Sequence, residues 1–384
     1  MSGKTKTPAA VDPNEVKFWV AFSLIPGVGT QRVRSLVARF GTLAVAWSAA
    51  RTELREAGLD SRTVRQIAEE RTNLDPDSEW ERLQQAKVQA LIWDDPAYPP
   101  RLREIPDPPP VLYLKGELSP QDDLSLAVVG TRRPTPYGRQ VAEEMSYKLA
   151  AGRITVVSGL ARGVDGIAHR AALQAGGRTI AVMACGLDMV YPPEHKKLAL
   201  EIAERGALLS EQPLGVQPRG DFFPRRNRIL SGMSLGVLVI EGDEKSGALI
   251  TANMANDQGR EVFCVPGSIF STQSRGTNLK IQRGEAKLVL NVDDVLEELN
   301  LRTAPEQIAM IELSPATDTE AALLRHISRE PVHIDEVCRD SGLPVSTVSS
   351  LLAMMELKGL VKEMGAKSYV IAREAAAAYG SAES

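Results

Sequence analysis

The sequence predicts an α/β protein whose central part, residues 124–300, is a Rossmann-like, doubly wound and mainly parallel sheet. Short apolar runs rich in β-branched residues alternate there with helical stretches, and each run ends in a glycine or polar turn. Continuous apolar strands are typical of parallel sheets that helices cover on both faces. At 384 residues, the chain is long enough to add smaller domains before and after this core.

Seven segments of the central part have the composition of buried strands. They are residues 124–129, 154–157, 179–184, 207–209, 237–240, 262–265 and 287–290. The stretches between them have helical patterns, so the sheet should be doubly wound, with helices on both faces.

The first hundred residues contain all four tryptophans, which indicates a separate domain over residues 1–97. Residues 16–24 and 30–40 predict two helices, and Ile25-Pro-Gly-Val-Gly29 joins them in the pattern of a helix-hairpin-helix (SAM-like) domain. Glycine amides in such a turn can face a phosphate. A tight turn without a ligand is the favoured alternative, because the hairpin has no lysine. Residues 98–123 are rich in proline and predict an ordered connector.

A second small domain is predicted after residue 300. Residues 301–318 have the composition of a linker, residues 319–372 follow the winged-helix pattern, and residues 373–384 form a tail. The expected helices are residues 320–327, 334–340 and 345–358, and the expected hairpin strands are residues 361–364 and 367–371. The third helix offers serine and threonine but no arginine, which suits a weak DNA contact or a partner surface better than reading of the major groove.

Composition limits the possible functions. A net charge of −4 and a pI near 5.8 argue against a protein that coats nucleic acid nonspecifically, so any nucleic-acid site should be local. No apolar run approaches the length of a membrane span and no export signal is visible, so we expect a cytoplasmic protein. The three cysteines are far apart and predict buried free thiols. The histidines show no zinc-type pairing, so neither a metal nor a cofactor is expected.

Glycine-rich loops follow four of the predicted strands. They read Gly130-Thr-Arg132, Ser158-Gly-Leu-Ala-Arg-Gly-Val-Asp165, Cys185-Gly-Leu-Asp188 and Glu241-Gly-Asp-Glu-Lys-Ser-Gly247. Because ligands bind at the carboxyl ends of parallel strands, these loops should converge on one site. Glycine lets backbone amides approach a ligand, and a helix that starts directly afterwards favours an anion. One such loop is explained equally well as a strand-to-helix turn, but four together predict a phosphate site.

The fourth predicted strand is followed by the densest arginine cluster in the chain, Phe222-Phe-Pro-Arg-Arg-Asn-Arg228. Guanidinium groups bind phosphates in a fork and stack on bases, and Phe222 or Phe223 could offer a ring face to a nucleobase. A solvated helix face is the alternative. The combination of aromatic and basic residues favours single-stranded nucleic acid.

The candidate DNA-binding residues combine these loops with the arginine cluster. They are Arg132, Ser158, Gly159, Arg162, Gly186, Phe223, Arg225, Arg226, Asn227, Arg228, Lys245, Ser246 and Gly247. Of these, Arg132, Arg226, Arg228 and Lys245 are expected to hold phosphates, while Ser158, Gly159, Ser246 and Gly247 present polar or backbone donors. No catalytic residue is assigned, because Asp165, Asp188 and Glu211 at the loop starts are better explained as helix caps or arginine partners.

Ordered motifs along most of the chain resemble the DprA (Smf) family of single-stranded-DNA-binding proteins of natural transformation. They include Gly130-Thr-Arg132, Ser158-Gly-Leu-Ala-Arg-Gly-Val-Asp165, Gly186-Leu-Asp188 with Tyr191-Pro192, Phe223-Pro-Arg-Arg-Asn-Arg-Ile229, Lys245-Ser-Gly-Ala-Leu-Ile-Thr-Ala252, Val265-Pro-Gly267 and Gly276-Thr-Asn278. The resemblance implies a Rossmann-like core that dimerises, binds and protects single-stranded DNA in a basic pocket, and delivers it to the RecA recombinase. Two residues depart from the family pattern, Lys280 and Glu285, so the final helix is expected to pack or dimerise differently.

The rival interpretation is an enzyme of the nucleotide-hydrolysing, phosphoribohydrolase-like Rossmann class. Such enzymes use a Pro-Gly-Gly-x-Gly-Thr-x-x-Glu loop. The corresponding strand end here, residues 241–251, has a lysine before the glycine and no glutamate at the catalytic spacing. Because a phosphate cradle without a placed acid or base cannot supply acid–base assistance, we expect a binding protein rather than an enzyme.

Overall fold

The computed structural model describes residues 12–301, 322–328, 330–357, 360–365 and 367–371, and it divides into two compact units, Met1–Leu301 and Arg302–Ser384. The predicted linker, apart from Leu301, and the predicted tail lie outside the described residues. Among the described helices, none has the length and apolar character needed to cross a bilayer.

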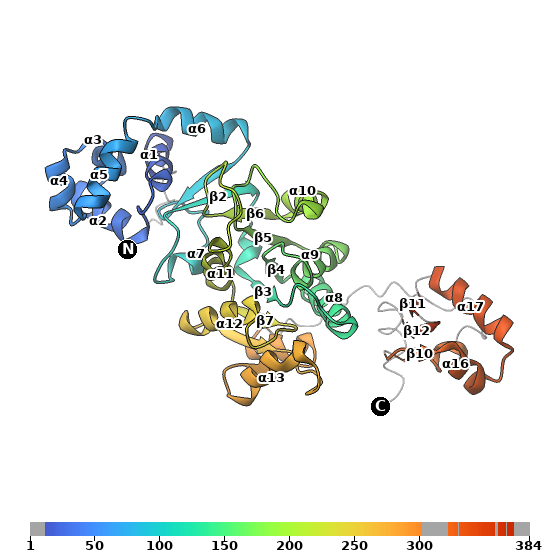
Figure 1. The fold of residues 1–384 in the computed structure, drawn as a ribbon. Helices are drawn as coiled ribbons and strands as arrows, with labels where there is room; N and C mark the ends of the chain where they lie inside the picture. The colour runs from blue at the N-terminus through green and yellow to red at the C-terminus, as the bar shows by residue number, and fades with distance from the viewer. Residues whose placement is uncertain (1–11, 302–321, 329, 358–359, 366, 372–384) are drawn as a thin grey trace, which may run out of the picture. The chain divides into compact units, whose positions relative to one another are not determined.

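The first unit begins with a bundle of short helices (Figure 1). They are α1 (Pro13–Leu24), α2 (Thr30–Phe40), α3 (Leu43–Ser48), α4 (Arg51–Glu56), α5 (Ser61–Glu70) and α6 (Pro76–Gln85). The two helices predicted around the hairpin are therefore confirmed. Side-chain caps explain several of the starts, since Asp12, Asp60 and Asp75 each accept a hydrogen bond from an amide of the first turn.

A sheet of nine strands follows, in the order β1-β2-β6-β5-β4-β3-β7-β8-β9. The strands are β1 (Gln89–Ile92), β2 (Val111–Gly116), β3 (Ser125–Val129), β4 (Thr155–Ser158), β5 (Thr179–Met183), β6 (Ala207–Ser210), β7 (Gly236–Val239), β8 (Glu261–Cys264) and β9 (Lys287–Leu288). All pairs from β6 to β9 are parallel. The mainly parallel sheet and its seven predicted strands are confirmed.

Strands β1 and β2 were not predicted. They pair with each other and β2 pairs with β6, both antiparallel, so the sheet takes in residues that the sequence assigned to the helical domain and the connector. The apolar run at Val111 was visible in the sequence, but the prolines before it suggested a connector. Those prolines instead lie in the long connection between the two strands. This connection also contains α7 (Pro100–Arg103).

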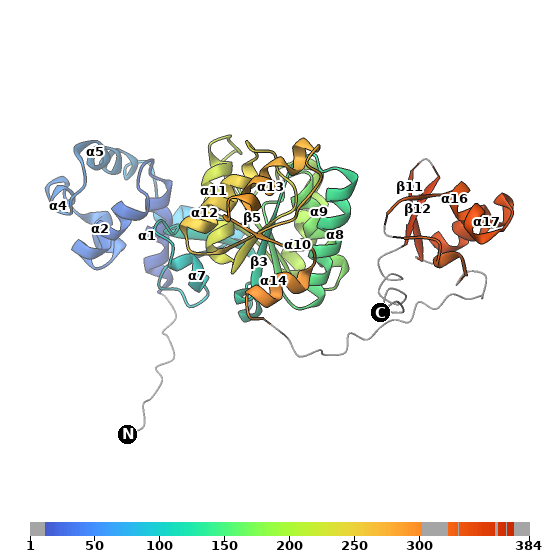
Figure 2. The same cartoon turned by 90° about the horizontal axis from the view of Figure 1, so that it is seen from below.

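Helices cover both faces of the sheet (Figure 2). One face carries α8 (Pro136–Ala151), α9 (Val164–Gln174), α10 (Lys196–Arg205) and α14 (Val292–Glu298), and the other carries α7, α11 (Phe222–Met233) and α12 (Gly247–Asp257). The remaining helix α13 (Arg275–Gln282) follows β8, and short 3-10 turns lie at Pro120–Asp123, Pro193–His195 and Thr272–Ser274. This arrangement confirms the doubly wound core.

The strand order reverses between β3 and β7, because β3 leads to β4 on one side while its other neighbour is β7. Loops after two such strands diverge toward opposite faces, which leaves a crevice at their carboxyl ends where ligands bind in open α/β sheets.

The second unit has the predicted winged-helix elements. They are β10 (Val332–His333), α16 (Ile334–Ser341), α17 (Val345–Leu357), β11 (Val361–Gly365) and β12 (Ser368–Ile371). Strand β10, which was not predicted, completes a three-stranded sheet, and Val337, Leu352 and Val361 lie in its core. The first predicted helix lies partly outside the described residues.

The cysteines are free thiols as predicted, with Cys185 and Cys264 buried and Cys338 half-buried. Over the described ranges, no three His, Cys, Asp or Glu side chains form a group that could hold a metal ion.

Candidate nucleic-acid interface

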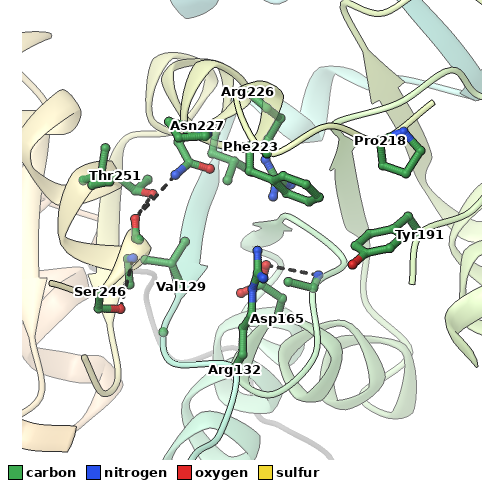
Figure 3. Close-up of a pocket in the computed structure, with 18 residues that line it drawn as sticks. Val129, Arg132, Asp165, Tyr191, Pro218, Phe223, Arg226, Asn227, Ser246 and Thr251 are labelled. Atoms are coloured by element: carbon green, nitrogen blue, oxygen red, sulfur yellow. Dashed lines mark hydrogen bonds between the residues drawn. The ribbon is translucent and has the colours of Figure 1, made fainter. Parts of the chain in front are cut away.

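A cleft of about 710 Å³ opens at the crevice between β3 and β7 (Figure 3). Gly130 and Arg132 after β3 line one side, and Ser246 and Gly247 at the start of α12 line another. Helix α11 supplies Phe223, Arg226, Asn227 and Leu230, which lie at spacings of three and four and therefore on one face of the helix. The cleft thus joins three of the four predicted glycine loops to the arginine cluster, since Ala161 and Asp165 of the second loop also line it.

A cation and two aromatic rings meet at one side of the cleft. The Arg132 guanidinium lies 5.3 Å from the centroid of the Phe223 ring, within the range of a cation–π contact. The Tyr191 ring meets Phe223 edge to face, with the centroids 5.7 Å apart. Arg132 is exposed and has no ion pair among the residues that the structure describes, so its charge can act on a ligand.

Arg226 is buried in the wall of the cleft, with 4% of its surface exposed. Burial lowers the pKa of its guanidinium to about 10, so it stays charged at neutral pH. It donates to the carbonyl of Val182, while its Nε has no partner. A Cβ on Gly159 would overlap this guanidinium, so a side chain at position 159 would force the Arg226 guanidinium to move.

The loop after β4 does not offer the donors that the sequence suggested. The carboxylate of Asp165 accepts hydrogen bonds from the amides of Gly159 (3.1 Å) and Ala161 (3.3 Å). The Ser158 hydroxyl is fully buried and donates to the carbonyl of Val128 at 2.6 Å. The prediction that Ser158 and Gly159 present donors to a phosphate is therefore wrong, because an internal carboxylate and a strand carbonyl already accept them.

Asp165 itself borders the cleft, and its burial raises the pKa of the carboxyl group, while the positive charge of Arg226 acts in the opposite direction. Asp188 accepts from the amide of Gly215 at 3.0 Å, and Glu211 binds Arg228. Glu211 is thus an arginine partner, as the sequence predicted, whereas Asp165 and Asp188 accept from loop amides instead of capping a helix.

The loop after β7 is shaped by polar contacts. Ser246 caps α12 by accepting from the amide of Ala248 at 3.3 Å, and Asn227 donates to the carbonyl of Gly247 at 3.4 Å. The buried carboxylate of Glu241 accepts from the amide of Thr135 at 2.9 Å, which ties the loop after β3 to the end of β7. Lys245 is exposed but lies outside the lining of the cleft.

Four further candidates do not line the cleft. Arg228 pairs with Glu211 at 2.6 Å and with Asp107 at 3.4 Å, so its charge is neutralised within the fold, which argues against the phosphate contact that the sequence suggested. Arg162 pairs with Glu194 and is exposed, as is Arg225. Gly186 packs tightly, since a Cβ there would meet the carbonyl of Pro213. Residues two apart on a helix point to different sides, which is why Arg226 and Arg228 diverge.

Sequence reasoning missed Tyr191, Pro218, Ile250 and Thr251, all of which line the cleft. Tyr191 lies beyond the third glycine loop, and only the Tyr191-Pro192 motif pointed to it. In the helical hairpin, the amides of Val28 and Gly29 donate within the turn, which supports the interpretation as a tight turn.

Two family models match the chain. DNA recombination-mediator protein A matches residues 89–300, where β1 begins, and the DprA winged helix domain matches residues 311–367. Protein Smf of Synechocystis is 35% identical over 387 aligned positions, which cover 91% of this chain and 97% of that protein. DNA processing protein DprA of Bacillus subtilis is 46% identical over 203 positions, 53% of this chain and 68% of that protein.

Solved structures agree with these matches. DNA processing protein A from Streptococcus pneumoniae superposes with a TM-score of 0.66 and 35% identity, over 73% of this chain and 97% of that one. The protein from Helicobacter pylori, whose structure concerns its single-stranded DNA binding mode, gives a TM-score of 0.51 and 33% identity over 56% and 96% of the two chains. On these matches, the chain belongs to the DNA recombination-mediator protein A (DprA/Smf) family.

Proposed function

We propose that this protein binds single-stranded DNA in the cleft at the carboxyl ends of β3 and β7. The observation that carries the proposal is the exposed Arg132, stacked on Phe223 and close to the buried charge of Arg226, in a chain whose net charge is −4. An exposed cation that forms no ion pair attracts phosphate, and aromatic rings stack on unpaired bases. Duplex DNA keeps its bases paired and stacked, so the aromatic part of the cleft favours single strands.

The role that follows is that of a mediator in the cytoplasm, which protects the strand, acts as a homodimer and helps to load RecA. Family membership and the single-stranded DNA binding of the Helicobacter pylori relative support this role. Binding without catalytic turnover is also part of the proposal, because the carboxylates near the cleft hold amides or arginines.

The test measures the affinity of the protein for single-stranded and duplex oligonucleotides by fluorescence anisotropy, with release of base from a nucleoside monophosphate assayed on the same preparation. Arg132→Ala should weaken single-strand binding, whereas the matched control Arg162→Ala should not, because Arg162 is an exposed arginine paired with Glu194 outside the cleft. A preference for duplex DNA, or base release, would contradict the proposal.

The aromatic contact has a separate signature. Phe223→Ala should weaken binding by about 1 to 3 kcal/mol without changing its salt dependence, since a stacking residue carries no charge. Thermal melting of the variant checks that the loss does not come from unfolding. A changed salt dependence in a folded variant would show that Phe223 acts through Arg132 rather than on the DNA.

A further inference from the structure

Two large apolar side chains are displayed on a turn after β8. Ile269 is 84% exposed and Phe270 is 91% exposed, the highest values among the large hydrophobic residues that the structure describes. They occupy the corners of the turn 268–271, positions that glycine, proline, asparagine, aspartate or serine usually fill. Residues that conflict with the usual preferences of a turn are found mainly at functional sites.

The turn is held in place by polar contacts. Its ends are joined by a hydrogen bond from the amide of Ser271 to the carbonyl of Ser268 (3.0 Å), and the amide of Phe270 donates to the Ser268 hydroxyl (3.3 Å). Asn278 exchanges two hydrogen bonds with the backbone of Gly267, at 3.1 and 2.9 Å. The exposed pair is therefore presented on a fixed support, which reduces the entropy lost when a partner binds.

The turn lies at the same edge of the sheet as the cleft, because β8 is the parallel neighbour of β7. The loop after β7, whose Ser246 and Gly247 line the cleft, is bonded to the segment that follows the turn: the amide of Gly242 donates to Gln273 (2.7 Å) and that of Gly276 to Gly242 (2.9 Å). From the other side, the Tyr137 hydroxyl donates to the carbonyl of Pro266 at 2.8 Å. Tyr137 is itself 47% exposed, at the start of the helix that follows Arg132.

Positive charge accompanies these aromatic residues. Arg133, Arg139 and Lys245 are exposed at this edge, and none forms an ion pair with another described residue. Of the acidic residues there, Glu244 is paired with Arg275 at 3.2 Å, and the carboxylate of Asp243 accepts from the amide of Glu244. Unpaired cations interleaved with exposed rings are typical of surfaces that bind single strands.

We propose that Phe270, supported by Ile269, is a second stacking contact for the DNA strand held in the cleft, and that Arg133 and Arg139 bind the phosphates between the two contacts. This inference rests on the proposed function. A single strand is the occupant that fits, because the surface continues the edge of the cleft and carries cations. A protein partner of purely apolar chemistry would leave those cations unused.

The test compares oligothymidylates of two lengths, about four nucleotides, which fill the cleft alone, and about twenty, which reach the turn. Phe270→Ala should weaken binding of the long strand about five- to a hundredfold and leave the short one unchanged. Arg139→Gln should flatten the salt dependence for the long strand only, by about 0.7 in the slope of log affinity against log salt. Leu200→Ala, at a 54% exposed position on α10, is the matched control and should change neither.

Each outcome has one interpretation. If wild-type protein binds neither length, the proposed function fails and this inference with it. If the wild type binds both lengths and Phe270→Ala binds them equally well, the DNA does not reach the turn and only this inference is wrong. Loss of self-association in Phe270→Ala, measured by light scattering with DNA affinity unchanged, would identify the turn as a contact between protein copies.

Discussion

A substitution of Arg228 tests the structure directly, because the sequence pattern and the structure predict different effects for it. Arg226 and Arg228 look equivalent in the sequence, yet Arg228 is bound to Glu211 at 2.6 Å, and the two side chains are only 15% and 12% exposed. Arg228→Ala would leave the Glu211 carboxylate without its partner, and the other oxygen of that carboxylate already has no hydrogen bond. Removing one member of a buried ion pair lowers the free energy of unfolding by about 3 to 5 kcal/mol. Because both side chains of this pair are slightly exposed, we expect a value at the lower end, about 3 kcal/mol.

The expected result is a fall of about 6 °C in melting temperature, with the salt dependence of DNA binding unchanged. Arg132→Ala should instead affect DNA binding and not stability. Its loss should leave the melting temperature nearly unchanged and flatten the slope of log affinity against log salt by about 0.7, the value for one phosphate contact on a single strand. Calorimetry and anisotropy titrations at several salt concentrations measure the two effects independently.

A second substitution tests whether the unpaired charge of Glu211 causes the loss of stability. In the Arg228→Ala background, Glu211→Gln should restore about 1 kcal/mol or more, because it removes the unpaired charge. If Arg228→Ala instead melts like the wild type and flattens the salt slope, then Arg228 contacts DNA and the reasoning from its ion pair is refuted.

Three further predictions follow from the structure. Gly159→Ala should lower stability by about 1 to 3 kcal/mol and weaken DNA binding, because its Cβ would displace the Arg226 guanidinium; normal melting and affinity would show that the space exists. Removing the residues after Leu301 should leave single-strand affinity within about tenfold, or 1.4 kcal/mol, since the cleft lies entirely before them; a larger loss in titrations would include the winged helix in the site. Burial lowers the pKa of His169 from 6.5 to about 3, so the unfolded chain binds its proton first and stability, complete above pH 6.5, should fall as the pH drops toward 3. The free energy of unfolding, measured across this pH range, should change less with pH in His169→Gln than in the wild type. An unchanged pH dependence would be inconsistent with a neutral buried imidazole.

The sequence predicted the fold well because apolar strands and their turns are local signals. Three core strands, β3, β4 and β6, are followed directly by a glycine or polar residue, and the other four end within one or two residues of the predicted end. Strands β1 and β2 escaped prediction because their pairing spans a proline-rich stretch, and pairing over that distance leaves no local pattern.

The site was predicted less completely, because composition does not give the direction of a side chain. The arginine cluster was recognised, but only its helical phase distinguishes Arg226, which faces the cleft, from Arg228, which faces Glu211. The loop after β4 reads as a phosphate cradle in sequence, yet Asp165 from the following helix occupies its amides. Such an internal substitute for a ligand becomes visible only when the loop and the helix are seen together.

The antiparallel pair β1–β2 also has a consequence for folding cooperativity. It joins the helical bundle to the sheet in one hydrophobic core, which includes Trp19 and Leu36 of the bundle together with Tyr113 of β2 and Leu208 of β6. A cluster of this kind cannot lose one part without exposing the other to water, so the two parts should melt in a single transition. The tryptophans, although confined to the first hundred residues, should therefore report by their intrinsic fluorescence on the unfolding of the whole first unit.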